Sequence, residues 1–261
     1  MKTLLATFAV LSLAACALFA QTPTMSCDRQ GNRNRPGFCE IRENTITATS
    51  LTIDGSQNGG ISIKGADRSD ILVRSMVQAQ GESEAEARTM GAQVLVHTSG
   101  GAVQADGPSG GSWSVSYEVF IPRHTNVSLK TRNGGVSIAG VESNVEFHSV
   151  NGGVSLKDVG GSIHGDTMNG GVSISFAKAG LTGQGLDVST NNGGVSIKVP
   201  EQFSALLDVS TVNGGMNVRL PNAQVRKGEH QLSLPLGAGG PLIRVRTQNG
   251  GVSISSNNEK A

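Results

Sequence analysis

A short motif recurs along most of this chain and limits what it can fold into. Asn-Gly-Gly is followed by an apolar, a polar and another apolar residue seven times. The copies begin at Asn58, Asn133, Asn151, Asn169, Asn192, Asn213 and Asn249. A unit this short cannot bury an apolar face by itself, so neighbouring units must stack on each other. The motif therefore predicts a repetitive body.

The residues around each motif alternate between apolar and polar. Val136-Ser137-Ile138 is typical of the run that follows the glycines, and a second alternating run precedes each Asn. The last inward position of that second run is a small hydroxyl residue, namely Thr131, Ser149, Thr167, Thr190, Thr211 or Thr247. A period of two is typical of β-strands, so the repeat predicts two strands joined at an Asn-Gly-Gly corner.

We predict an all-β fold, a parallel β-solenoid (β-helix) with coils of about 18 residues. The alternative is an antiparallel hairpin meander, because Asn-Gly is also common in two-residue hairpin turns. We favour the solenoid because only parallel, in-register stacking places identical residues beside each other, about 4.8 Å apart. The corners are expected to use Asn and Gly because both tolerate a positive φ.

The first third of the chain departs from this pattern. Leu51 and Ile53 have the opposite parity to later coils, which predicts a bulge before Asn58 or a differently shaped corner. A short helical insertion is expected over residues 83–93, covering strand edges at one end. Residues 112–122 predict a further strand whose aromatic side chains close the core, and the Gly-Gly at residues 100–101 is a candidate eighth, degenerate copy.

The N-terminus has the features of an export signal. Residues 1–20 combine Lys2 with an apolar run too short to span a membrane comfortably, which indicates a signal peptide. Cys16 lies in a sequence that resembles a lipoprotein box and is a lipidation candidate, although the same residues also satisfy the rule for ordinary signal peptidase. A third alternative is an uncleaved anchor. Residues 21–45 are expected to form a linker, residues 46–256 the repeat domain and residues 257–261 a frayed tail.

Two cysteines remain after Cys16. Cys27 and Cys39 form an even pair in a stretch rich in Gly, Asn, Arg and Pro. In an oxidising compartment such a pair closes a small disulfide loop, and the alternative is two free thiols. No further ligands accompany the pair, so a structural zinc site is not expected.

The charge distribution argues against nucleic acid as the main partner. The formal net charge is +1, and the basic residues are scattered along the chain. Stacking the coils in sequence order would gather Glu146, His164, Asp187 and Asp208 in one outward column. Such a column is a candidate site for a divalent cation or for cleavage of a polysaccharide; the alternative is a solvated outer face. No catalytic motif is recognised, and we predict no catalytic residue, cofactor or metal.

Three stretches together resemble a known family. Residues 39–43 (Cys-Glu-Ile-Arg-Glu), the repeated Asn-Gly-Gly-Val-Ser-Ile and residues 113–119 (Trp-Ser-Val-Ser-Tyr-Glu-Val) are similar to a bacterial β-strand repeat family. Its members carry the name adhesin, and the domain otherwise has no known function. The resemblance covers residues 39–256 and implies an exported β-helical protein with a binding or structural role.

The sequence thus predicts an exported, non-enzymatic protein of the cell envelope, an adhesin-like binding protein or scaffold. Its partner would be a surface polymer, a glycan or an envelope protein, since a flat repetitive face suits a repetitive ligand. A lipid anchor would be the only link to a membrane, and the expected location is the periplasm, the outer membrane or the cell surface. The alternatives are a β-helical polysaccharide lyase or hydrolase and a self-associating structural element.

Overall fold

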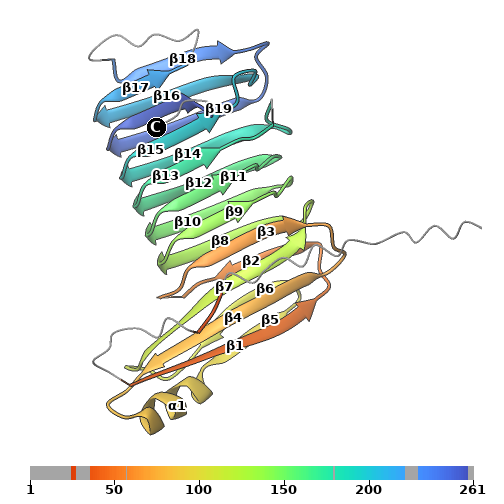
Figure 1. The fold of residues 1–261 in the computed structure, drawn as a ribbon, viewed down its shortest axis with the longest axis vertical. Coiled ribbons are helices and arrows are strands. Elements are labelled where there is room, and N and C mark those ends of the chain that lie inside the picture. The colour runs from red at the N-terminus through yellow and green to blue at the C-terminus, as the bar shows by residue number, and fades with distance from the viewer. Residues whose placement is uncertain (1–24, 28–35, 57, 179, 221–228, 258–261) are drawn as a thin grey trace, which may run out of the picture.

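The computed structural model describes residues 25–27, 36–56, 58–178, 180–220 and 229–257. The chain forms a tall stack of coils, with the N-terminal part at the lower end of Figure 1 and the C-terminal part at the upper end. Each coil contributes one strand to each of two ten-stranded sheets that enclose the core between them. The prediction of an all-β fold with one short helix is confirmed.

The regular coils pair in parallel on both sides. One sheet, here called the long-strand sheet, takes the strand that precedes each Asn-Gly-Gly, and the short-strand sheet takes the strand that follows it. The long strands are β8 (Asn126–Asn133), β10 (Val145–Asn151), β12 (Ser162–Asn169), β14 (Gly185–Asn192), β16 (Ala205–Asn213) and β19 (Leu242–Asn249). The short strands are β9 (Val136–Ala139), β11 (Val154–Lys157), β13 (Val172–Ser175), β15 (Val195–Val199), β17 (Met216–Arg219) and β20 (Val252–Ser256). Val136 pairs with Val154 and Val154 with Val172, so equivalent residues lie beside each other, as a hairpin meander would not allow.

The two ends of the stack contain antiparallel pairs. The N-terminal elements are β1 (Gly37–Ile46), β2 (Ser50–Asp54), β3 (Ile61–Ala66), β4 (Ile71–Gln80), α1 (Glu84–Gln93), β5 (Leu95–Ser99), β6 (Ala102–Asp106) and β7 (Ser112–Pro122). Strands β1, β4 and β7 are antiparallel neighbours, as are β5 and β6. At the C-terminal end β18 (Gln231–Leu236) pairs antiparallel with β16. Chain reversals therefore close a stack whose middle is entirely parallel.

The coils do not stack in sequence order, which corrects the expectation. The last coil, β19 and β20, lies between the coil of β14 and β15 and the coil of β16 and β17. In Figure 1 the darkest blue strands accordingly lie below lighter blue ones. The N-terminal end shows the same arrangement, because β2 and β3 lie between the coil of β8 and β9 and the coil of β6 and β7. At each end a coil is inserted between two others.

The corner asparagines form one continuous ladder. For every Asn after Asn58, the Nδ2 donates a hydrogen bond to the Oδ1 of the Asn on the next coil toward the N-terminal end, at 2.8 to 3.1 Å. From that end the spatial order is Asn58, Asn133, Asn151, Asn169, Asn192, Asn249 and Asn213. The ladder joins all seven copies of the motif, including the two inserted coils.

The corner glycines are needed for a different reason from the one expected. Among the described residues, the glycines with a positive φ lie outside the Asn-Gly-Gly corners. At Gly152, a Cβ would lie 2.1 Å from the carbonyl oxygen of Gly134 in the next coil. The first glycine of the other stacked corners meets the same obstacle. Close approach between coils, rather than a left-handed backbone, therefore excludes a side chain there.

The inward hydroxyl residues complete the hydrogen bonding of each corner. All six are buried, and each hydroxyl donates to the carbonyl oxygen of the first corner glycine in a neighbouring coil, at 2.8 to 3.4 Å. Thr190, for example, donates to Gly170 at 2.8 Å. A buried carbonyl without a partner would be costly, which accounts for a hydroxyl at this position in each of these coils.

The structure tests two predictions for the first third of the chain, the bulge before Asn58 and the eighth repeat copy at residues 100–101. Ile53 pairs with Leu129 and Asn58 bridges Asn133, so this coil has one residue more than its neighbour before the corner. Ser56 has a φ of 53° there, and the predicted bulge is confirmed. By contrast, Gly100 and Gly101 form the two-residue hairpin turn between β5 and β6, so the suggestion of an eighth repeat copy was wrong.

The N-terminal end is also where the expected boundaries change. Residues 37–45, expected as linker, belong to the edge strand β1. Cys27 and Cys39 form a disulfide that ties residues before β1 to this strand. Helix α1 is capped by Ser83 and packs on β1 and β4, as predicted for the helical insertion. Residues 1–24, with the expected signal peptide and Cys16, lie outside the described residues, as do residues 258–261 of the expected tail.

The interior is a thin layer made mainly of Val, Ile and Leu. Phe147 and Tyr117 are the largest fully buried side chains. Strand β7 carries Tyr117 into the core near the N-terminal end, as predicted from residues 112–122. Phe120 lies on the opposite side of the strand, where Lys64 Nζ is 5.2 Å from its ring centre, so the expectation that it closes the core was wrong. Within the described part of the chain, no helix has the length and hydropathy needed to cross a membrane.

Candidate binding faces

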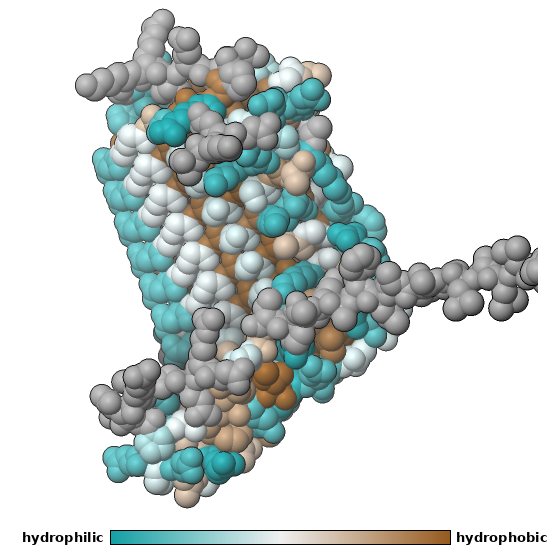
Figure 2. Space-filling view, viewed as in Figure 1, coloured by the Kyte–Doolittle hydropathy of each residue, from teal (hydrophilic) through white to brown (hydrophobic). Residues whose placement is uncertain are grey.

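The stack presents two outward faces, one on each sheet. We call the outward residues of β3, β9, β11, β13, β15, β20 and β17 the serine face, and those of β8, β10, β12, β14, β19 and β16 the charged face. Figure 2 shows regular rows of hydrophilic, near-neutral and hydrophobic residues along the long axis of the stack. Such rows arise because in-register pairing places equivalent side chains one above the other.

The charged face contains the predicted column of titratable residues, but in a different order. Glu146 pairs with His164, and His164 with Asp187. Asp187 then pairs with Arg244 of the inserted strand β19, and Arg244 pairs with Asp208. The structure thus brings together three of the four predicted residues and separates Asp208 from them, because the last coil is stacked out of sequence order.

Ion pairs neutralise much of the charged face. Arg244 lies 3.1 Å from an oxygen of Asp208 and 3.6 Å from an oxygen of Asp187. Arg246, in the next outward row, lies 2.9 Å from Asp187. Alternation of opposite charges on neighbouring strands is the stabilising arrangement, since like charges directly opposite each other repel. Asp187 and Asp208 therefore have partners within the protein and are poorly placed to act as ligands.

Glu146 and His164 border a shallow groove at the N-terminal ends of the long strands. Its other polar lining comes from Ser50, Thr52, Asn126, Ser128, Asn144 and Ser162. Both predicted residues are exposed. Among the described residues, no group of three or more His, Cys, Asp or Glu is arranged to hold a metal ion. The groove offers hydroxyl and amide groups for hydrogen bonding but gathers only one carboxylate and one imidazole.

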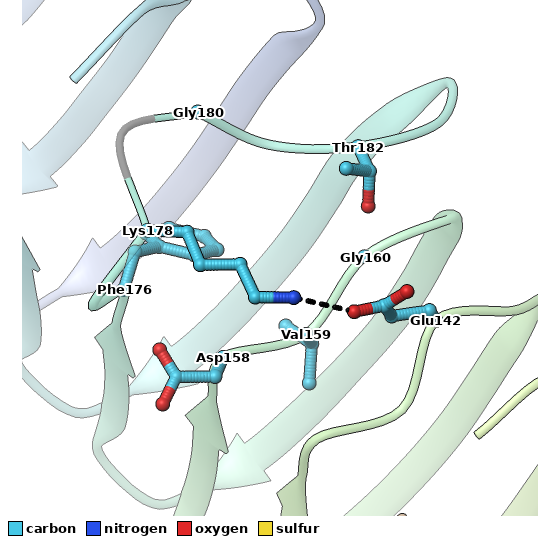
Figure 3. Close-up of a pocket in the computed structure, with 8 residues that line it drawn as sticks. All are labelled: Glu142, Asp158, Val159, Gly160, Phe176, Lys178, Gly180 and Thr182. Atoms are coloured by element: carbon cyan, nitrogen blue, oxygen red, sulfur yellow. Dashed lines mark hydrogen bonds and ion pairs between the residues drawn. The ribbon is translucent and has the colours of Figure 1, made fainter. Parts of the chain in front are cut away.

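A second, very small pocket lies on the edge of the stack opposite the Asn corners, where the chain returns from the short strands to the long ones. Figure 3 shows Lys178 reaching across it to Glu142, with 2.6 Å between Nζ and Oε1. The hydrogen bond and charge of Lys178 hold the pKa of Glu142 below its ordinary value. The cavity volume is about 10 Å³, which is room for one water. The pocket is therefore too small for a ligand larger than water.

Unlike the charged face, the serine face presents polar groups that have no partner within the described part of the protein. Its central column contains Ser62, Ser137, Ser155, Ser173, Ser196, Ser253 and Asn217 in spatial order. In the described part of the chain these hydroxyl groups make no hydrogen bond to protein, whereas the six inward hydroxyls that precede the corner asparagines are all bonded. The column is therefore free to bond with water or a ligand.

The charges on the serine face all have one sign. Its seven strands contain Lys64, Lys157, Lys198 and Arg219 but neither Asp nor Glu. Lys64 pairs with Glu118 of β7 at 2.7 Å. The other three cations are exposed and have no ion pair among the described residues. The sequence pattern shows these residues as outward but could not reveal their arrangement, because the order of the coils was unknown.

The architecture is thus a stack of two-strand coils with Asn-Gly-Gly corners, in two mostly parallel sheets. The chain belongs to the Toastrack DUF4097 family, whose model matches residues 43–255. The sequence also resembles a family of adhesin-like proteins of unknown function, and the family match agrees with that resemblance. Among curated proteins, none is similar enough in sequence to count as a relative.

Several solved structures are similar to this chain at low sequence identity. A protein from Clostridium sporogenes, provisionally named a cell adhesion protein, is 11% identical with a TM-score of 0.44, covering 84% of this chain and 100% of its own. A provisionally named lipid binding protein from Parabacteroides distasonis is 10% identical, with a TM-score of 0.35 and coverage of 83% and 96%. A provisionally named adhesin from Bacteroides fragilis is 10% identical, with a TM-score of 0.32 and coverage of 83% and 97%.

Proposed function

We propose that this protein is an exported, non-enzymatic binding protein or scaffold of the cell envelope, and that its serine face binds a repetitive polymer. The observation that carries the proposal is the contrast between the two faces. On the charged face, Asp187 and Asp208 are paired with arginines of the same face. On the serine face, a straight column of hydroxyls has no partner among the described residues.

A polymer suits this surface better than a small ligand. Neighbouring hydroxyls of the column repeat at about 4.8 Å along the stack, so the face presents the same group at regular intervals. Each contact is weak, but many contacts along one chain act together because the later ones form at a high effective concentration. The polymer would be a glycan or another surface polymer of the envelope.

The non-enzymatic part of the proposal rests on the described residues, among which we recognise no catalytic arrangement. Of the four residues of the predicted outward column, Glu146 and His164 line a groove, and that groove is shallow. A glycosidase of the usual kind needs two carboxyl groups placed on either side of the scissile bond. The groove supplies one. Export itself is proposed from residues 1–20 of the sequence, and the disulfide between Cys27 and Cys39 suits an oxidising compartment.

An array of glycans and cell-wall polymers, probed with the mature protein, tests this proposal. We expect retention of one class of polymer, and we expect the double variant Ser155→Gln with Ser173→Gln to lose it, because two larger side chains interrupt the column. The matched control, Ser189→Gln with Ser210→Gln, changes the charged face and should bind like the unmodified protein. The proposal is wrong if no polymer is retained, or if the serine-face variant and its control bind equally well.

A further inference from the structure

A second row of residues runs beside the serine column, two residues further along each short strand. We call it the cation row. In spatial order it contains Lys64, Ala139, Lys157, Ser175, Lys198, Ser255 and Arg219. A basic residue on one strand is thus always followed by a small residue on the next. The cations occupy every second strand of this part of the sheet.

This alternation gives the row a defined charge period. Neighbouring strands lie about 4.8 Å apart, so the cations repeat at about 9.6 Å along the stack. The insertion of the last coil creates the period at the upper end. Ser255 of β20 separates Lys198 from Arg219, which would be neighbours if the coils followed the sequence. The unusual stacking order therefore determines the pattern that a ligand meets.

The free cations are available to a ligand from outside. Lys157, Lys198 and Arg219 are exposed, and the small residues Ser175 and Ser255 between them are too short to cover them. Asp158, the carboxylate next to Lys157 in the chain, lies in the following turn and accepts a hydrogen bond from the Ala177 amide at 2.6 Å. Lys64 marks the lower end of the row, where Glu118 neutralises it. The remaining positive charges thus favour an anionic partner.

We propose that the serine face binds an anionic glycan that carries one negative charge for every two sugar units. This inference rests on the function proposed above and names the class of polymer. The cations would pair with carboxylate, sulfate or phosphate groups on alternate sugars, a repeat of comparable length to the period of the row. The unpaired hydroxyls of the neighbouring column would bond to the sugar hydroxyls between those charges. Exposed charge pairs are screened by salt, so the affinity falls as ionic strength rises.

Binding measurements with three soluble polymers test the charge period. Hyaluronan has one carboxylate per disaccharide, polygalacturonate has one per sugar, and dextran has none. We expect the mature protein to bind hyaluronan at least tenfold more tightly than dextran at low ionic strength, and more tightly than polygalacturonate at equal concentration of carboxylate. A preference for polygalacturonate would overturn the inference, because it would follow charge density rather than spacing.

A variant with permuted charges separates spacing from net charge. Lys198→Ser combined with Ser175→Lys keeps the same number of cations and places two of them on adjacent strands. We expect its affinity for hyaluronan to fall at least tenfold, with an unchanged melting temperature. Lys130→Gln, which removes an exposed cation from the charged face, should bind within twofold of the unmodified protein. Unchanged affinity in the permuted variant would overturn the inference.

The failure of this inference can be told apart from failure of the proposed function. Suppose that the protein binds dextran and hyaluronan equally, and that Ser155→Gln with Ser173→Gln abolishes binding to both. The serine face then binds polymers regardless of their charge, and only the inference is wrong. If that double variant binds every retained polymer normally, the face is not a binding surface and both proposals are wrong.

Discussion

The two outward faces are built on the same coils, yet they treat polar groups in opposite ways. On the charged face, the inserted strand β19 places Arg244 between Asp187 and Asp208, so the charges pair within the protein. On the serine face, the inserted strand β20 of the same coil places Ser255 between Lys198 and Arg219, so the charges stay apart. One topological event therefore neutralises one face and spaces the cations of the other.

This contrast indicates how such a stack can separate stability from binding. Residues whose polar groups are satisfied by neighbouring coils contribute to the stack, and their replacement should reduce stability. Residues whose polar groups have no partner within the described chain should be replaceable without loss of stability. Substitutions of one residue of each kind can therefore be compared, and the corners come first because both faces depend on them.

The largest expected effect comes from the close contact between corners. Gly152→Ala would place a methyl group 2.1 Å from the carbonyl oxygen of Gly134, so adjacent coils must move apart. We expect the free energy of unfolding, measured by chemical denaturation, to fall by about 3 kcal/mol. Gly153→Ala is the matched control, because its nearest neighbour is the Gly171 oxygen at 3.4 Å. Equal losses in the two variants would contradict the close-approach explanation.

The next largest effect is expected when an inward, hydrogen-bonded hydroxyl is removed, compared with an outward hydroxyl of the serine face. Thr190→Val removes the buried bond to the Gly170 carbonyl and leaves that oxygen without its hydroxyl donor. We expect a loss of about 1–2 kcal/mol in the free energy of unfolding. Ser173→Ala, in the outward column, should change it by less than about 0.5 kcal/mol. A comparable loss in both variants would mean that the outward column is also needed for folding.

Charge reversal should reduce stability on the charged face and binding on the serine face, with a smaller effect on stability than the substitutions above. Arg244→Glu removes the partner of Asp187 and Asp208 and adds a third carboxylate, and we expect a loss of about 1 kcal/mol in stability. Lys198→Glu should leave the melting temperature unchanged and abolish binding to the polymer selected on the array. If Lys198→Glu destabilises the fold while Arg244→Glu does not, the assignment of roles to the two faces is reversed.

The interior near the N-terminal end offers a test by titration. Burial, with smaller contributions from Asp54 and Asp106, raises the pKa of Tyr117 far above its usual value near 10. The folded state holds this proton more tightly than the unfolded state, so its contribution to stability is complete below about pH 10 and is lost as the pH rises further. Tyr117 is the only tyrosine, so ultraviolet absorbance follows it directly. An ordinary titration of the folded protein near pH 10 would contradict the buried position.

The sequence revealed the parts of this fold that depend on local pattern. Alternation of apolar and polar residues identified the strands, and the hydroxyl before each Asn identified the inward ladder. The stacking order could not be read in this way, because Asn213 and Asn249 lie in equivalent motifs and either could follow Asn192. The predicted site failed at Asp208 for this reason, and the cation row was missed. The corner glycines were identified correctly but explained wrongly, since a clash between coils is invisible in one repeat.

The order of the coils is the central claim, and crosslinking between corners tests it most directly. The pair Asn192→Cys with Asn249→Cys puts two cysteines on adjacent coils, whereas Asn192→Cys with Asn213→Cys puts them two coils apart. Under mild oxidation, mass analysis of unreduced peptides should find the crosslink in the first variant alone, with the bond between Cys27 and Cys39 unaffected. A crosslink between positions 192 and 213 instead would show that the coils follow the sequence, contradicting both the cation row and the pairing of Arg244.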